Sequence, residues 1–113
     1  MQITAELVKE AFEDTGLEQA PGKFYIKEEN KACGLGAVYV YLTGDFDAQG
    51  SDVSNFMKDN GLYCPTLWGT GFDQGVKGKD YSEKGSVMAP SLAGNKVGLA
   101  YRALVKEREV EYV

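Results

Sequence analysis

The segment ACGLGAVYVYLTG, residues 32–44, decides how this 113-residue chain folds. It joins a cysteine and two glycines to an apolar run, so it fits either a reactive thiol on a glycine-rich loop or the most buried segment of a small protein. As a strand, residues 37–43 have high β propensity. As a helix, they are apolar on nearly every side, which is typical of a fully buried helix. Periodicity alone does not decide between helix and strand for so short a run.

Two features of the segment favour a buried helix. Cys33-Gly34-Leu35-Gly36-Ala37, followed by aromatic and aliphatic side chains, resembles a Cys-x-x-Gly-Ala helix of small uncharacterised bacterial and phage proteins. The resemblance implies a helix and no activity. The two glycines do not match a dinucleotide-binding fingerprint, because Tyr39 stands where the third glycine belongs. We expect them to mark a close approach of a neighbouring backbone.

Helix signals stand on both sides of this segment. Thr4 can cap a first helix that ends at Gly16. Ser51 or Asp52 can cap a helix that ends at Gly61-Leu62. Short helices joined by tight turns are therefore expected before and after residues 32–44.

Two further helices are expected in the second half of the chain. Pro65 suits the first position of a helix that carries Trp68 and Phe72 on one face and ends at Gly75-Val76. A last helix runs from about Pro90 to Val110 and carries a broad apolar arc, so it should be buried over much of its circumference. Within it, Gly94 and Gly98 lie four positions apart and predict a packing notch.

The sequence thus predicts a mostly α protein, a compact single domain spanning 1–113 with four or five short helices and at most one short β-hairpin. The alternative is an α+β fold in which residues 23–28 and 37–43 pair as a hairpin. Both arrangements use most of the same core residues.

Composition narrows the classes of function. The net charge of −5 argues against nucleic-acid binding, and no apolar run approaches the roughly 20 residues that span a bilayer. No secretory pattern opens the chain, so we expect a soluble, acidic, cytoplasmic protein with reduced thiols. The absence of histidine removes the commonest general base and metal ligand, and no cofactor is expected.

The two cysteines are the candidate catalytic residues. Cys33 and Cys64 are each expected near a helix N-terminus, where the helix dipole favours a thiolate. Neither belongs to a Cys-x-x-Cys pair, and no histidine can activate them. Because free cysteine is often a small buried hydrophobe, we expect both to be structural.

One stretch partly matches a calcium loop. Asp45, Asp47 and Gln49 supply oxygen atoms at positions 1, 3 and 5, and Gly50 follows at position 6. Position 12 is Phe56 instead of the bidentate glutamate. We therefore expect a polar turn and no metal site.

Aromatic and basic residues are the remaining indication of function. Lys77, Lys79, Lys84 and Lys96 could form a basic strip in a mostly acidic protein. The sequence favours a non-enzymatic protein–protein interaction module, accessory or inhibitory, that could form a homodimer. The binding residues expected for it are Tyr63, Trp68, Tyr81, Lys77 and Lys79. The alternative is a small-molecule-binding protein or a thiol-dependent enzyme that uses Cys33 or Cys64.

Overall fold

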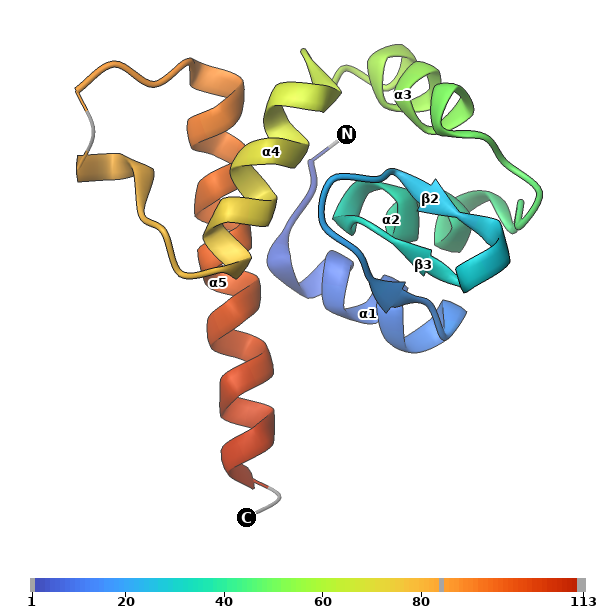
Figure 1. The fold of residues 1–113 in the computed structure, drawn as a ribbon, viewed down its shortest axis with the longest axis horizontal. Helices are drawn as coiled ribbons and strands as arrows, with labels where there is room; N and C mark the ends of the chain where they lie inside the picture. Colours follow the sequence, from blue (N-terminus) through green and yellow to red (C-terminus); the bar gives the residue numbers. More distant parts are fainter. Residues whose placement is uncertain (1, 84, 112–113) are drawn as a thin grey trace.

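The computed structural model describes residues 2–83 and 85–111. Helices dominate these residues, and a small sheet lies over one of them (Figure 1). The elements are, in chain order, α1 (Ala5–Thr15), β1 (Glu18–Gln19), β2 (Tyr25–Ile26), β3 (Lys31–Ala32), α2 (Gly34–Thr43), α3 (Gly50–Asp59), α4 (Pro65–Val76) and α5 (Ala89–Glu111), with single 3₁₀ turns at Lys27–Glu29 and Tyr81–Glu83. The expectation of a mostly α fold with a short β element is confirmed.

The sheet is small and pairs differently from the α+β alternative. Its strand order is β1-β3-β2, with β1 parallel and β2 antiparallel to β3. Residues 37–43 lie in α2, so the hairpin between 23–28 and 37–43 in the α+β alternative is not formed. A helix satisfies its own backbone hydrogen bonds, which lets it be buried on every side where a short edge strand would leave groups unpaired.

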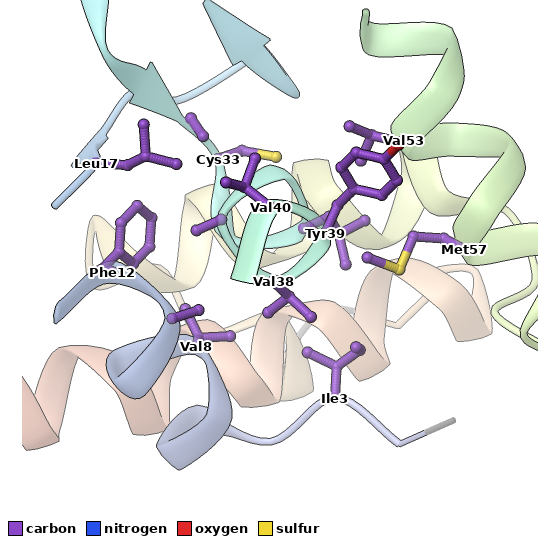
Figure 2. Close-up of a cluster of buried hydrophobic side chains, with 14 of the residues drawn as sticks. Ile3, Val8, Phe12, Leu17, Cys33, Val38, Tyr39, Val40, Val53 and Met57 are labelled. Carbon is purple, nitrogen blue, oxygen red and sulfur yellow. The ribbon is translucent and has the colours of Figure 1, made fainter. Parts of the chain in front are cut away.

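Helix α2 forms the centre of the hydrophobic core. All residues from Gly34 to Val40 are buried. Figure 2 shows Val38 facing Val8 of α1, while Tyr39 faces Val53 and Met57 of α3. Residues 32–40 of the quoted segment are therefore buried, as its composition predicts, but the prediction is wrong for Leu42, which is 47% exposed.

The glycines of this segment mark close contacts, as expected. A β-carbon on Gly36 would collide with the carbonyl oxygen of Phe24, and one on Gly34 would lie 2.8 Å from the ring of Phe72. The loop after β1 and helix α4 are therefore both held against the first turn of α2. These two contacts position the walls of the cavity described below.

Helices α4 and α5 pack side by side through glycines (Figure 1). On α5, β-carbons at Gly94 and Gly98 would collide with the carbonyl oxygens of Trp68 and Phe72. On α4, Gly71 and Gly75 lie equally close to the backbone of α5. The notch predicted at Gly94 and Gly98 is confirmed, and α4 supplies a matching pair.

One helix start differs from the sequence-based expectation. The N-cap of α3 is Gln49, and Asp52 accepts a hydrogen bond from the Gln49 amide at 2.8 Å. Neither Ser51 nor Asp52 is the cap residue, because the helix begins at Gly50. Helix α4 ends at Val76, as expected, but the left-handed residue after it is Gly78 and not Gly75.

Helix α5 is less buried than its apolar arc suggests. Among its residues up to Lys106, Gly94, Asn95 and Gly98 are the buried ones, and most apolar side chains are half-exposed. The expectation of burial over much of its circumference is wrong. The physical reason is that α5 contacts α4 closely through the backbone at Gly94 and Gly98, while of its larger side chains Tyr101 packs against Phe72 with ring centroids 5.7 Å apart.

Candidate functional site

A cavity of about 80 Å³ lies where three segments meet. These are the loop between β1 and β2, the residue that precedes α2, and one face of α4. Its lining residues are Gly22, Lys23, Phe24, Cys33, Thr66, Gly69, Thr70 and Asp73. The four α4 residues follow the i, i+3, i+4, i+7 spacing of a single helix face.

Asp73 is the buried acidic group of this cavity. Its side chain is 7% exposed, and Oδ2 accepts a hydrogen bond from the Gly22 amide at 2.8 Å. Oδ1 is also buried and has no hydrogen-bond partner among the described residues. Burial raises the pKa of this carboxyl, and the Gly22 amide and the Lys77 charge oppose that shift. The lining of the cavity therefore includes a carboxylate with one oxygen that has no partner among the described residues.

Cys33 lines the same cavity, but its surroundings do not activate it. It is the N-cap of α2, as expected, and it is 3% exposed. Burial raises the pKa of the thiol to about 12, which outweighs the amides of Gly36 and Leu35 at the helix start. The charge of Asp73 also raises it. At neutral pH Cys33 is a protonated thiol and a poor nucleophile.

Cys64 occupies a different place in the molecule. It is the N-cap of α4 in a left-handed backbone conformation, with φ of 53°, and it is partly buried. With Lys58, Gly61, Leu62 and Tyr63 it lines a groove of about 390 Å³ at the α3–α4 connection. Both cysteines are free, and the structure places them in separate sites.

The residues predicted to bind a partner do not form one surface. Tyr63 precedes α4 and is 76% exposed, whereas Lys77 and Lys79 follow α4 and are exposed beyond its other end. Tyr81 is half-buried, and its amide donates to Asn95.

The prediction of Trp68 as a binding residue is wrong. It is 4% exposed and stacks on Phe72 with ring centroids 5.6 Å apart, so it belongs to the core and not to a contact surface. Of the proposed basic strip, Lys84 lies outside the described residues.

The partial calcium loop uses its oxygens for protein contacts. Asp45 accepts from the Tyr39 hydroxyl and from the Asp47 amide, both at 3.0 Å. Asp47 pairs with Lys27, and Gln49 forms a capping box with Asp52. Within the described part of the chain, no group of three acidic or cysteine side chains is arranged to hold a metal ion.

Sequence reasoning missed the cavity and its acidic group. The available signal was the spacing of Thr66, Thr70 and Asp73, three polar residues on one face of an otherwise apolar helix, with the small Gly69 between them. The contribution of Gly22 and Cys33 to the same site had no local signal, since it depends on how distant segments pack.

No helix in the described ranges combines the length and the apolarity that crossing a membrane requires. Comparisons with protein-family models, curated proteins and solved structures find no match to this chain. The chemistry of its own side chains therefore carries the functional proposals that follow.

Proposed function

We propose that this chain is a non-enzymatic protein-binding module whose contact surface is the groove at the α3–α4 connection. The observation that carries the proposal is the exposure of Tyr63, 76% of whose surface is open beside that groove. Tyrosine is among the residues that contribute most to protein interfaces, because it combines a rigid apolar ring with a polar end.

The lining of the groove defines the chemistry of the partner. Leu62, Tyr63 and Cys64 supply apolar walls, and Lys58 adds a positive charge to the lining. These groups fit a partner protein that inserts an apolar side chain and places a carboxylate beside Lys58. Charge complementarity of this kind also accelerates association.

The thiol-dependent alternative has weaker support. A catalytic cysteine must form a thiolate near neutral pH, and the pKa of Cys33 is raised to about 12. Among the described residues that line the groove at Cys64, none is acidic and none is a second cysteine that would act with it. The groove is thus better suited to contact than to covalent chemistry.

A two-step experiment tests the proposal. First, a photo-cross-linking phenylalanine analogue at position 63 captures the partner from a lysate of the native cell. The purified partner is then titrated against the wild type and Tyr63→Ala. We expect at least tenfold weaker binding, since truncating a central interface tyrosine costs about 2 kcal/mol or more. Equal affinity for the two proteins would refute the proposal.

Two controls make the measurement specific. Met88 is 61% exposed and lies outside the groove, so Met88→Ala should bind the partner like the wild type. Lys58→Glu should weaken binding of a partner that presents a carboxylate. Cross-linking to a second copy of this chain would identify the partner as the protein itself, and sedimentation velocity would then show a dimer that Tyr63→Ala weakens.

A further inference from the structure

We propose that the cavity beside Asp73 binds the protonated amine of a small ligand, with Asp73 Oδ1 as its principal acceptor. This site is separate from the protein-binding groove, because the two share no lining residue. The inference therefore does not depend on the proposed function.

The unpaired oxygen is the first observation. Nearly all buried polar atoms in folded proteins have a hydrogen-bond partner, because leaving one unpaired is costly. Here Oδ2 is fixed by the Gly22 amide at 2.8 Å, while Oδ1 is buried without a partner among the described residues. Asp73 lines the cavity, and we infer that a donor bound there reaches Oδ1 and supplies the missing hydrogen bond.

The acceptor groups beside Oδ1 favour a ligand that can donate several N–H hydrogen bonds. The Thr70 hydroxyl donates its proton to the Thr66 carbonyl at 3.0 Å, so its oxygen is left with lone pairs to accept. Thr70 and Asp73 are three positions apart on α4 and face the same side. A primary ammonium, with three N–H donors and a positive charge, matches an ionised carboxylate and a hydroxyl oxygen.

The same groups disfavour other ligand classes. An anion would meet the Asp73 carboxylate, which repels it. A divalent metal needs more oxygen or thiolate ligands than the cavity offers, since Cys33 is protonated and Asp73 is the one carboxylate among the described residues that line it. An amine requires neither a thiolate nor a second acidic residue.

The size of the cavity limits the ligand to a few non-hydrogen atoms. A cavity of about 150 Å³ accommodates benzene, and this one measures about 80 Å³. Gly69 contributes to that space, because a β-carbon at this position would have no neighbour within 4 Å. Methylammonium, ethanolamine and glycine are ligands of suitable size.

Lys23 distinguishes a simple amine from an amino acid. It lines the cavity and is exposed, so its charge repels a ligand that carries only an ammonium. The same charge attracts a ligand that also carries a carboxylate. Lys23→Gln should therefore strengthen methylammonium binding and weaken glycine binding, which separates the two sources of the ammonium group.

The proposal is tested by titrating ¹⁵N-labelled protein and following the amides of Gly22, Gly69 and Thr70 by NMR. The probes are methylammonium, ethanolamine and glycine at millimolar concentrations, with tetramethylammonium as a control that has the charge but no N–H donor. We expect saturable shifts at these amides with at least one of the three amines and none with tetramethylammonium.

Two substitutions complete the test: one removes the charge of Asp73, and the other fills the cavity at Gly69. Asp73→Asn removes the charge and should weaken amine binding at least tenfold, while Asp14→Asn, at an exposed carboxylate, should not. Gly69→Leu should fill the cavity and block binding, while Gly85→Ala, at another glycine with open surroundings, should not. Absence of shifts with all three amines up to 100 mM, or unchanged affinity in Asp73→Asn, would overturn the proposal. Tyr63→Ala should retain amine binding whatever it does to partner binding.

Discussion

The amide of Gly22 donates a hydrogen bond to Oδ2 of Asp73 at 2.8 Å, and it joins two residues 51 positions apart in the sequence. This bond ties the loop between β1 and β2 to α4. It also fixes the orientation of the carboxylate, so that the second oxygen remains buried without a partner among the described residues. The fold therefore holds the Asp73 carboxylate where it loses contact with water, which costs free energy of folding.

Because burying this charge costs free energy, we expect Asp73→Asn to stabilise the protein at neutral pH. Burial raises the pKa of this carboxyl above its ordinary value of 3.8, so the folded state binds the proton more tightly than the unfolded state. The resulting stability is fully present below pH 3.8 and is lost as pH rises through the folded pKa. Asp73→Asn should therefore melt a few degrees higher than the wild type at pH 7 and at nearly the same temperature at pH 3.

Thermal melts followed by circular dichroism at the two pH values check this prediction. Asp14→Asn, which removes an exposed carboxylate, serves as the control and should change the melting temperature little. A wild type that is as stable as Asp73→Asn at pH 7 would show that the carboxylate is well solvated or paired.

Substitution by alanine should have opposite effects on stability at Gly94, where α5 contacts α4, and at Gly69, which has open space around it. In Gly94→Ala the new methyl group would collide with the carbonyl oxygen of Trp68, which is backbone and cannot rotate away. We expect a loss of about 1–3 kcal/mol in the free energy of unfolding. Gly69→Ala meets no atom within 4 Å and replaces a poor helix former, so it should gain up to about 1 kcal/mol.

Urea denaturation of both variants beside the wild type measures this difference. The two substitutions add the same methyl group to helical positions, so they are matched in chemistry and differ in surroundings. Equal effects in the two variants would mean that the helices are not in close contact at Gly94.

Among polar side chains, removal of Asn95 should cause the largest loss in the free energy of unfolding. It is fully buried, and its Nδ2 donates to the carbonyl oxygens of Lys79 at 2.7 Å and Gly71 at 3.2 Å. Its Oδ1 accepts from the Tyr81 amide at 2.8 Å. Asn95→Ala leaves these backbone groups without their partner and should cost about 3 kcal/mol.

Two measurements test this role of Asn95. Urea denaturation gives the change in stability, with Asn55→Ala at an exposed position of α3 as the control. Hydrogen exchange at the Tyr81 amide should be faster in Asn95→Ala, because this residue holds the loop after α4 to α5. Unchanged exchange at that amide would contradict the assigned role.

The two cysteines should differ in their reaction with alkylating reagents. Cys64 is partly exposed at a groove, whereas Cys33 is 3% exposed and the pKa of its thiol is raised to about 12. Iodoacetamide at pH 7.5 should modify Cys64 in the native protein and leave Cys33 intact until the chain unfolds. Peptide mapping by mass spectrometry, with Cys64→Ser as the reference, reads out each site. Rapid modification of Cys33 in the native state would restore the thiol-dependent alternative.

Local features of the sequence predicted several helix boundaries correctly. The Thr4 side chain accepts from the Leu7 amide at 3.1 Å, and Gly16 takes the left-handed conformation that ends α1. Pro65 begins α4, and Gly61 with Leu62 ends α3 through a bond from the Leu62 amide to the Met57 carbonyl. These features were predictable because caps and stops act between residues a few positions apart.

By itself the sequence predicted burial of residues 33–43, because an apolar run loses free energy when it faces water; the structure confirms this as far as Val40 but leaves Leu42 47% exposed. Only the tertiary structure decided which groups surround the cavity. Gly22, Cys33 and Asp73 come from three separate segments, and of these only Asp73 has a local signal, its spacing from Thr66 and Thr70. Their meeting depends on the carbonyl of Phe24 lying against Gly36 and the ring of Phe72 lying against Gly34. Close contacts between distant segments leave no local pattern, and so the cavity could be found only once the chain was folded.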